Sequence, residues 1–431
     1  MTVDLAAIKE KPYYFSNRAL KRLIVPMIIE QFLAILVGMS DSIMVATVGE
    51  HAVSGVSLVD NIFILLIYLF AALATGGAVV MGQYLGQNKH EKANRAVNQL
   101  ILFTALFAIC IMIGLYLARN LILHRVFGAI EANVMEASKT YLLIVSASIP
   151  FIALYNAGAA VFRTMGNSKV PMYLSMMMNA INVGGNAILI FGFDMGVAGA
   201  ATSTLVSRVI SAVAIILLLC SPEHLLHLER PFSFKLDFGM LKKIAYIGIP
   251  NGLENGMFQL GKIMVLSMIT GFGTAAIAAN AVSNIIATFQ VLPGMSVGMA
   301  VITVCSRCVG AGDYEAARYY TRKILKLVHI LIIVFSVTTL VALPGIMHLY
   351  NLSDDAMTFT KQIIWYHGIC CMLPSTWVRK IRLSGVEVFA GAYNIGYIKK
   401  YDGMFPEIYT GVDYGVYPRP RQYNMGVKIN F

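Results

Sequence analysis

Acidic and amide side chains inside long apolar segments are the residues of this sequence whose types suggest chemistry. Asp41 lies inside the first apolar run, which extends from about residue 22 to residue 47. A carboxylate at the centre of a bilayer is unfavourable unless it faces a cavity, pairs with another group or binds a cation. The alternative is a neutral, hydrogen-bonded acid that only packs helices. Because acids inside membranes are functional by default, we favour a functional Asp41.

Asparagines at helical spacing follow in a later apolar segment. Asn182 and Asn186 are one helical turn apart and share a face, and Asn179 lies about one turn before Asn182. Their amides can supply oxygens to Na⁺ or bond a protonated acid, which suggests a Na⁺ site near Asp41, Asn182 and Asn186. Hydrogen bonding between helices explains them equally well. The remaining candidates for the cavity wall are Tyr141, Tyr155 and Thr202.

A second intramembrane acid, Glu254, lies near the start of the apolar segment 243–271. It either takes part in ion coupling or substrate binding, or extends toward the membrane interface. Asn255 and Gln259 are weaker candidates on the same segment. Asp60 begins the second apolar segment near a membrane surface, which predicts a solvated side chain.

No arrangement of residues suggests catalysis. The eight histidines are scattered, and no glycine-rich loop has the lysine spacing of a nucleotide-binding loop. Cys305 and Cys308 have the spacing of a metal or redox pair, but they stand alone at the end of an apolar segment. We therefore expect no enzyme and no cofactor. Any transport would use a gradient of Na⁺ or H⁺ rather than ATP.

The composition places these residues in a membrane. Hydrophobic residues make up 58% of the 431 residues and charged residues only 13%, about half the charged share of a soluble domain. Each apolar segment is close to the ~20 residues that cross ~30 Å of hydrocarbon. We predict ten spans, at about 22–47, 56–82, 97–118, 138–162, 170–193, 196–221, 243–271, 278–306, 324–346 and 359–374.

The placement of the basic residues indicates how the chain is oriented in the membrane. The net charge is +11, and lysines and arginines are concentrated in alternate connections between spans, which places the N-terminus in the cytoplasm. Residues 1–22 are polar and basic, and the run that follows is too long for a signal peptide, so we expect a retained first span. No basic stretch carries interleaved aromatic residues, so nucleic acid is not an expected partner.

An internal repeat organises the spans. Pro26 and Pro250 begin similar segments, and the same offset of 224 residues pairs Gly86 with Gly310. An offset of six helices makes the copies parallel, with the substrate site expected between them. The first copy continues for two more spans, whereas the second stops at Pro374. The predicted parts are a cytoplasmic N-terminus at 1–22, a first lobe at 23–221, a cytoplasmic linker at 222–242, a truncated second lobe at 243–374 and a foreign tail at 377–431.

The tail departs from the helical pattern. From Trp377 onward the apolar runs disappear, and the aromatic share is about double the chain-wide 10%. From Gln422 to Phe431 polar and apolar residues alternate, which is typical of a transmembrane β-strand with one face to lipid. The segment from Val386 to Tyr393 is a second candidate strand.

Several strings in the helical part carry a family resemblance. They are Pro26 through Gly49 with Asp41 inside it, Gly82-Gln-Tyr-Leu-Gly86, Phe162-Arg-Thr-Met-Gly166 followed by Pro171, Gly196-Val-Ala-Gly-Ala-Ala201, Gly248-Ile-Pro-Asn-Gly-Leu-Glu254 and Gly310-Ala-Gly312. With these strings, residues 15–374 resemble the multidrug and toxic compound extrusion (MATE) family. The resemblance implies twelve helices in two six-helix lobes. It also implies exchange of inward-moving Na⁺ or H⁺ for outward-moving organic cations.

The resemblance has different consequences for single residues. Asp41 matches the family's first-helix aspartate, which is linked to cation coupling. Some members carry an aspartate where Asn186 stands, so one negative charge of that ion site is absent here. In Na⁺-coupled members a glutamate lies about one turn after Glu254, where this chain has Phe258. The resemblance therefore leaves the coupling ion open.

The tail resembles a different family, the TonB-linked outer-membrane receptors of glycan uptake, at their C-terminal end. The matching residues are Tyr401-Asp-Gly403, Pro406-Glu407, Val412 through Arg421, and the final strand to Phe431. One or two strands leave open edges that lipid does not tolerate, so the tail is not expected to act as a barrel here. We interpret the joint near 375–377 as a gene-fusion, recombination or assembly event.

The predicted fold class is an all-α polytopic membrane protein of about ten helices, with a six-helix lobe, a truncated second lobe and a short β-type tail. The leading interpretation is a Na⁺- or H⁺-coupled antiporter that exports small organic cations or drugs. We expect a monomer that contacts lipids in a bacterial inner membrane. The alternatives are a flippase for lipid-linked substrates, a non-functional truncated fusion fragment and an outer-membrane receptor.

Overall fold

The computed structural model describes residues 15–123, 131–229, 234–269, 272, 274–349, 353–372, 385–393 and 422–430. These residues belong to two compact units, Met1–Cys371 and Met372–Phe431. The first unit is helical in its described residues. Its elements are α2 (Asn17–Ala46), α3 (Glu50–Gly86), α4 (His90–Leu121), α5 (Ala132–Ser146), α6 (Ile149–Thr164), α7 (Lys169–Asn186), the π-helix η2 (Ala187–Gly192), α8 (Gly196–Leu219), α9 (Phe238–Ile269), α10 (Thr274–Gly310), α11 (Tyr314–Leu349) and α12 (Asp354–Met372).

Each predicted span coincides with a helix, or with two consecutive helices, among the described residues. Seven of these helices are long and apolar enough to cross a membrane, or eight if the bent pair α5 and α6 forms one span. The helices α9 and α12 fall outside that set. The first unit is therefore a polytopic membrane fold, and the count of ten spans stays a prediction.

Two predicted spans are not single straight α-helices. The segment predicted at 138–162 consists of α5 and α6, which meet at a bend of 49°. Pro150 lies in the first turn of α6, and proline lacks the N–H that would continue the helical hydrogen bonds across the bend. The segment predicted at 170–193 consists of α7 and η2, and η2 begins directly after Asn186. Such π-helical turns often occur at functional sites.

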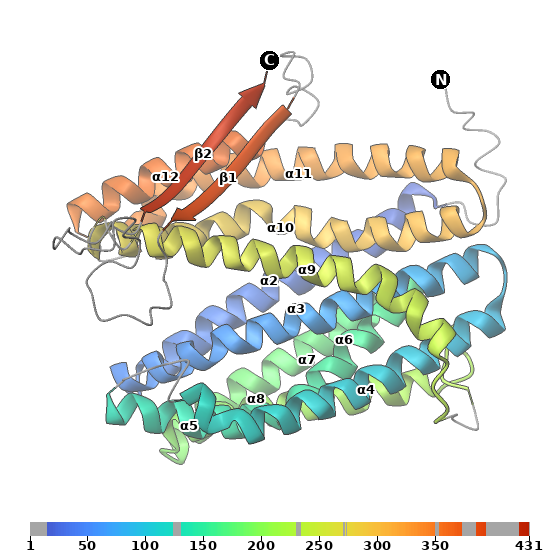
Figure 1. The fold of residues 1–431 in the computed structure, drawn as a ribbon, viewed down its shortest axis with the longest axis horizontal. Helices are drawn as coiled ribbons and strands as arrows, with labels where there is room; N and C mark the ends of the chain where they lie inside the picture. Colours follow the sequence, from blue (N-terminus) through green and yellow to red (C-terminus); the bar gives the residue numbers. More distant parts are fainter. Residues whose placement is uncertain are drawn as a thin grey trace, which may run out of the picture. The chain divides into compact units, whose positions relative to one another are not determined.

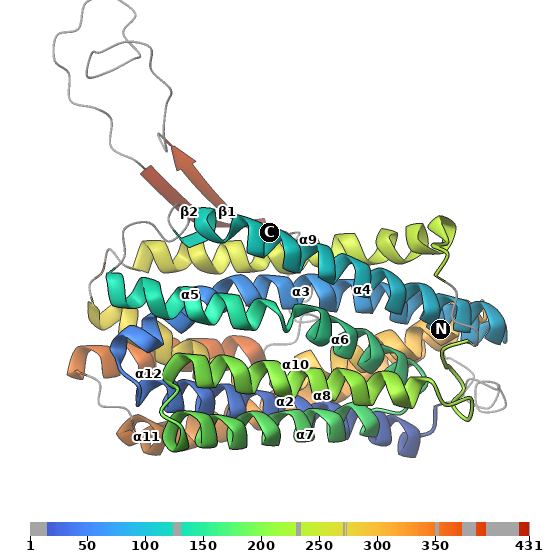
Figure 2. The same ribbon diagram turned by 90° about the horizontal axis from the view of Figure 1, so that it is seen from below.

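The helices of the first unit run side by side along one direction (Figure 1). We define α2–α8 as the first lobe and α9–α12 as the second lobe. Within the first lobe, α7 and α8 are neighbours (Figure 2). Between the lobes, α3 packs on α9 and α10 packs on α2. The second helix of each lobe therefore contacts the first helix of the other.

The repeat that the sequence predicts is present in the helix boundaries. Both α3 and α10 are 37 residues long. Their first residues, Glu50 and Thr274, and their last residues, Gly86 and Gly310, differ by the same 224 positions. Because contacts between the lobes also pair up under this offset, a pseudo-twofold axis relates the two copies.

The two repeat-related helices cross near their C-terminal ends. A Cβ atom on Gly86 would overlap the backbone oxygen of Arg307 in α10, and a Cβ atom on Gly310 would overlap that of Gln83 in α3. Glycine has no Cβ and permits this close approach. Gln83 and Arg307 are themselves 224 residues apart, so the contact is symmetrical.

The N-terminal end of α2 is anchored to the second lobe, and this matters because α2 carries Asp41. The side chain of Ser16 caps the helix by accepting a 3.1 Å hydrogen bond from the backbone nitrogen of Ala19. The backbone nitrogen of Phe15 donates to the hydroxyl of Tyr320 in α11 at 2.9 Å. The two rings also meet edge to face. These contacts fix where α2 enters the bundle.

The second unit contains a two-stranded antiparallel sheet in its described residues. Strand β1 (Gly385–Tyr393) pairs with β2 (Gln422–Asn430). The strands lie on the two tail segments whose sequence predicts strands, and whether they derive from a barrel stays a prediction. The predicted joint near 375–377 and the matching segment 401–421 lie outside the described residues.

Candidate functional site

Asp41 meets one of the predicted asparagines inside the first lobe. Asp41 is half-buried on α2, and its Oδ1 accepts a 2.7 Å hydrogen bond from Nδ2 of Asn186. Asn186 is the last residue of α7 and is 1% exposed. Because the two residues lie far apart in the sequence, the packing of α2 against α7 creates this pair.

Asn182 joins the pair from one turn earlier in α7. When its amide nitrogen faces Asp41, the nitrogen lies 2.8 Å from Oδ1 and 2.9 Å from Oδ2, and its oxygen accepts from Oγ1 of Thr204 at 3.2 Å. When the amide turns the other way, its oxygen faces both carboxylate oxygens and its nitrogen faces Thr204. Oxygens this close repel unless a proton or cation lies between them. The orientation with the nitrogen toward Asp41 therefore satisfies both neighbours, and Asn182 joins Asp41 on α2 to Thr204 on α8.

A cavity of about 140 Å³ lies beside this cluster and holds a second acid. Asp60 of α3 lines the cavity with Asp41, and its Oδ1 accepts a 3.1 Å hydrogen bond from the hydroxyl of Tyr141. The prediction of a solvated Asp60 is wrong. The helix α3 begins at Glu50, so Asp60 lies almost three turns inside it. Tyr141, a predicted wall residue, does line the cavity.

An arginine inside the first lobe lies close to both acids. Arg208 is in the middle of α8, and its Nη1 donates a 2.7 Å hydrogen bond to the buried hydroxyl of Ser148. Its positive charge interacts with those of Asp41 and Asp60. Arg208 therefore provides one positive charge near two acids, although it does not itself line the cavity.

Three other predicted residues lie away from this cavity. Thr202 precedes Thr204 by two positions on α8, which turns it about 200° around the helix, and it does not line the cavity. Tyr155 donates a 3.0 Å hydrogen bond to the backbone oxygen of Pro171. Asn179 also lies outside the lining, and its buried Nδ2 has no hydrogen-bond partner in the described part of the chain.

The candidates on α9 are separate from the Asp41 cluster. Glu254 and Gln259 belong to the second lobe, and neither lines the cavity that contains Asp41 and Asp60. Glu254 is exposed, and Gln259 is half-buried. The structure therefore does not bring Glu254 into one site with Asp41.

The repeat mate of Glu254 has the opposite environment. Glu30 on α2 is 5% exposed and forms an ion pair with Arg163 at the end of α6. A buried pair of this kind is stable only because each charge compensates the other. The ion pair ties α2 to α6 inside the first lobe.

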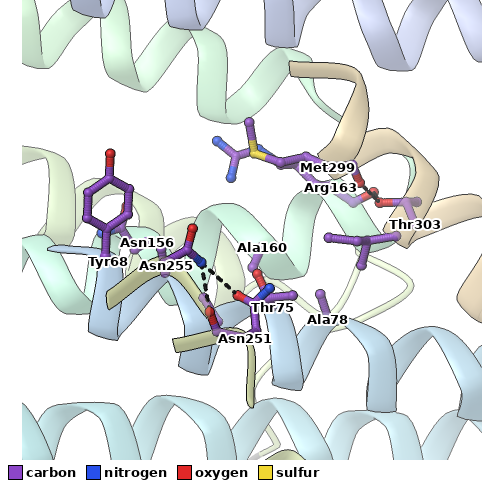
Figure 3. Close-up of a pocket in the computed structure, with 13 residues that line it drawn as sticks. Tyr68, Thr75, Ala78, Asn156, Ala160, Arg163, Asn251, Asn255, Met299 and Thr303 are labelled. Carbon is purple, nitrogen blue, oxygen red and sulfur yellow. Dashed lines mark hydrogen bonds between the residues drawn. The ribbon is translucent and has the colours of Figure 1, made fainter. Parts of the chain in front are cut away.

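Arg163 also faces a second cavity, of about 230 Å³, between the lobes (Figure 3). Its walls come from α3, α6, α9 and α10. The polar residues that line it are Tyr68, Thr75, Asn156, Arg163, Asn251, Asn255 and Thr303. Asn255, a weaker sequence candidate beside Glu254, thus lines this cavity rather than the Asp41 site.

The described residues contain no group of three or more His, Cys, Asp or Glu side chains that could hold a metal ion. The carboxylate oxygens that could serve Na⁺ come instead from Asp41 and from Asp60, which line the same cavity. The described part of the structure therefore gives no support for a metal site at Cys305 and Cys308.

Sequence reasoning missed several residues of these sites, among them Asp60, Arg163, Thr204 and Arg208. The signal for Arg208 was available, because a charge in the middle of an apolar segment is as unfavourable as the charge of Asp41. Arg163 lies in the last turn of its helix, where a basic residue also fits a membrane boundary. The sequence carried no signal for Thr204, because only the rotation of α8 around its axis shows which of its residues face Asn182.

The fold and the two cavities define the class of protein. A bundle of long apolar helices, with a parallel internal repeat and polar cavities within and between its lobes, is a multi-pass membrane protein with the architecture of a transporter. The MatE family model matches residues 26–188 and 250–374, which is more than half of the chain. The chain belongs to the MatE family.

Curated relatives agree with this assignment. YoeA of Bacillus subtilis (strain 168), a probable multidrug resistance protein, is 28% identical over 281 residues, which cover 64% of this chain and 60% of YoeA. NorM of Thermotoga maritima, also a probable multidrug resistance protein, is 24% identical over 310 residues, covering 69% of this chain and 64% of NorM. The chain thus spans less than two thirds of the length of either relative.

Solved structures show the same fold. A MOP superfamily transporter from Pyrococcus furiosus aligns with a TM-score of 0.77 at 21% identity, covering 86% of this chain and 82% of the transporter. An outward-facing MATE family transporter aligns with a TM-score of 0.72 at 21% identity, with the same coverage of 86% and 82%. Similarity at this level of identity concerns the fold alone.

Proposed function

We propose that this protein is a Na⁺- or H⁺-coupled antiporter that exports small organic cations or drugs. The observation that carries the proposal is the cluster of Asp41, Asn182 and Asn186 beside Asp60 in a cavity of the first lobe. Acids in such positions within membrane proteins commonly mark ion pathways. The names of the relatives, which describe multidrug resistance, support the substrate class.

In the proposed mechanism the amide of Asn182 changes its orientation when the ion binds. Without an ion, its nitrogen bonds the Asp41 carboxylate and its oxygen accepts from Thr204. When Na⁺ or H⁺ enters, the amide oxygen turns toward the ion, and the contact with Thr204 on α8 changes. An ion can shift a conformational equilibrium only by binding one state more tightly than the other. The changed contact between α7 and α8 supplies that difference.

The proposed antiporter is a monomer in a bacterial inner membrane, contacts lipids, and has its N-terminus in the cytoplasm. Its transmembrane lobes lie at 23–221 and 243–374, and a cytoplasmic linker at 222–242 joins them. The end of α8 at Leu219 and the start of α9 at Phe238 support this division. The concentration of basic residues in alternate connections supports the orientation.

The test is transport of ethidium by the purified full chain in liposomes, under an imposed Na⁺ gradient and, separately, an imposed pH gradient. We expect one of the two gradients to drive ethidium movement in the wild type. Asp41→Asn should abolish this movement, whereas Glu254→Gln, on the exposed residue, should leave most of it. If neither gradient moves ethidium, or if Asp41→Asn transports normally, the proposal is wrong and the view of an inactive fragment gains weight.

We also propose that the tail from about residue 377 was joined to the transporter by fusion, recombination or assembly, and derives from a TonB-linked receptor. The family match ends at residue 374, and the two compact units divide between Cys371 and Met372; both support a change at this position. The test is to sequence single genomic DNA molecules across the codons for residues 374–377. A transporter frame that continues into two more apolar helices would contradict the joint.

A further inference from the structure

In the first lobe, the segment that follows α8 covers the region where α3 ends and α4 begins. Its Leu226 and Leu228 are 0% and 6% exposed. They belong to one apolar cluster with four residues of these two helices, namely Met81, Leu85, Ala93 and Val97. The chain itself therefore occupies the groove between the end of α3 and the start of α4.

Two amides of α4 hold that segment in place. Oδ1 of Asn94 accepts a 3.2 Å hydrogen bond from the backbone nitrogen of His227, and Oδ1 of Asn98 accepts one of 3.2 Å from that of Glu229. Both asparagines are buried. Uncharged amides suit this role, because they pair with backbone groups without bringing a charge into the interior.

The repeat-related groove of the second lobe is open. It has a volume of about 400 Å³ and lies where α10 ends and α11 begins. Its lining includes the mates of the four cluster residues, which are Cys305, Val309, Ala317 and Thr321. Cys305, Val309 and Thr321 are half-buried, whereas the four residues of the first lobe are all buried. The same offset of 224 residues makes Arg318 and Arg322 the mates of Asn94 and Asn98.

The rim of the open groove is basic. Arg318 and Arg322 line it and are exposed, and their guanidinium groups form no hydrogen bond or ion pair within the described part of the chain. The acids next to them in the sequence, Asp313 and Glu315, do not line the groove. Two positive charges one helical turn apart repel each other, so an anion between them is favoured.

The groove lies at a membrane surface. The predicted span begins at residue 324, so Arg318 and Arg322 precede it by six and two residues, about 9 and 3 Å along the helix. Phospholipid headgroups occupy this depth. Leu325 comes seven residues after Arg318, on the same face of α11, and is 56% exposed. An apolar surface therefore leads from the basic rim into the hydrocarbon.

We propose that this groove binds an anionic phospholipid, with the phosphate between Arg318 and Arg322 and an acyl chain along α11 from Leu325. Guanidinium groups match the oxygens of a phosphate in geometry and charge. The first lobe has no equivalent site, because the segment after α8 occupies its groove. Lipid binding needs no transport, so this inference and the proposed antiport function can fail independently.

The experiment is native mass spectrometry of the detergent-purified full chain, titrated with dioleoylphosphatidylglycerol or with dioleoylphosphatidylcholine. The two lipids share their acyl chains and differ in headgroup charge. We expect the first phosphatidylglycerol to bind with a Kd about tenfold lower, because the choline group carries a positive charge that the arginines repel. Equal affinities overturn the inference. Excess soluble glycerol 3-phosphate should not displace the lipid, and displacement would overturn the inference by indicating a site for free phosphate compounds.

Two double variants with the same change of charge complete the test. Arg318→Asn with Arg322→Asn copies the amides of the first lobe and should raise the Kd of phosphatidylglycerol about tenfold. Lys89→Asn with Lys92→Asn removes two exposed charges at the start of α4, the related end of the first lobe, and should leave this Kd unchanged. An equal loss in both variants overturns the inference. If the arginine variant does not fold, the comparison of the two lipids in the wild type still decides.

Discussion

The two lobes share their packing but not their chemistry. At the crossing of α3 and α10, Gly86 contacts the turn of Arg307, and Gly310 contacts the turn of Gln83 in the same way. Each of these contacts is the repeat mate of the other. Because one backbone-to-backbone contact lies on the pseudo-twofold axis, a larger side chain in either copy would disturb both. Packing of this kind keeps the two copies alike.

The Asp41 cavity has no such symmetry. The repeat mate of Asp41 is Val265, which is 40% exposed on α9. The mate of Asp60 is Asn284, and the mate of Tyr141 is Trp365. None of the three mates can supply the acid or the phenol of the first lobe. The duplication therefore supplies a symmetrical frame, and the paired carboxylates of the Asp41 cavity are confined to one half of it.

Among pairs of repeat mates, we expect Glu30 and Glu254 to differ most in the stability that a substitution removes. Glu30→Gln leaves Arg163 as an uncompensated charge in the interior, and breaking a buried ion pair in this way destabilises a protein by about 3–5 kcal/mol. Glu254→Gln, at the exposed mate, should change stability by no more than about 0.5 kcal/mol. The free energy of unfolding in mixed micelles, measured by SDS titration, distinguishes the two.

A compensating variant sharpens this prediction. In Glu30→Gln with Arg163→Gln, both charges are gone, and much of the lost stability should return. If the double variant is no more stable than Glu30→Gln alone, the loss comes from the altered shape of the site rather than from the unpaired charge.

The second prediction concerns the asymmetry of the ion site. Asp41→Asn keeps the shape of the side chain but removes the negative charge that holds the ion, so gradient-driven transport should fall at least about 100-fold, equivalent to ~2.7 kcal/mol. The mirror variant Val265→Asp should not restore transport to Asp41→Asn, because the mates of Asp60 and Tyr141 are Asn284 and Trp365, which supply neither a second acid nor a phenol. Initial rates of ethidium transport in liposomes provide the measurement. Restoration by Val265→Asp would show that the lobes are chemically interchangeable.

The third prediction tests the symmetry of the packing. Gly86→Ala and Gly310→Ala each place a Cβ on the backbone of the opposite helix, and overpacking of this kind destabilises by about 1–3 kcal/mol. We expect the two variants to lose similar amounts, because the contacts are repeat mates. The thermal unfolding of the detergent-purified chain gives the comparison.

Gly345→Ala is the control for the glycine variants. No atom lies within 4 Å of a Cβ built at Gly345 in α11. Alanine has the higher helix propensity, so this variant should be neutral or more stable by up to about 1 kcal/mol. If Gly86→Ala and Gly310→Ala behave like the control, the helices at the crossing can separate without loss.

Much of the fold could be predicted from the sequence because apolar segments and the repeat do not depend on tertiary contacts. The offset seen at Pro26 and Pro250 gives the boundaries of α10 from those of α3 without error. The pairing of Asp41 with Asn186 also agrees with the prediction of one site, because both are polar residues inside apolar helices. The 49° bend between α5 and α6 was missed because apolar character continues across it.

The remaining contacts of the site depend on where each helix begins and how it is rotated about its axis, which composition does not encode. Asp60 was assigned to solvent because its apolar segment begins near it, whereas the helix begins ten residues earlier at Glu50. Thr202 was named as a wall residue and Thr204 was not considered, because only the rotation of α8 against α7 shows which of the two meets Asn182. The exposed position of Glu254 likewise follows from the placement of α9, not from its sequence.

The smallest expected effect decides between the two threonines. Thr204→Val removes the hydroxyl that bonds the Asn182 amide in either of its orientations. The free energy of unfolding in mixed micelles, measured by SDS titration, should therefore fall by about 1 kcal/mol, the net value of one hydrogen bond. Thr202→Val should leave it unchanged, because Thr202 is on another side of α8. If both variants lose the same stability, the bond to the Asn182 amide contributes nothing, and Thr204 has only a packing role.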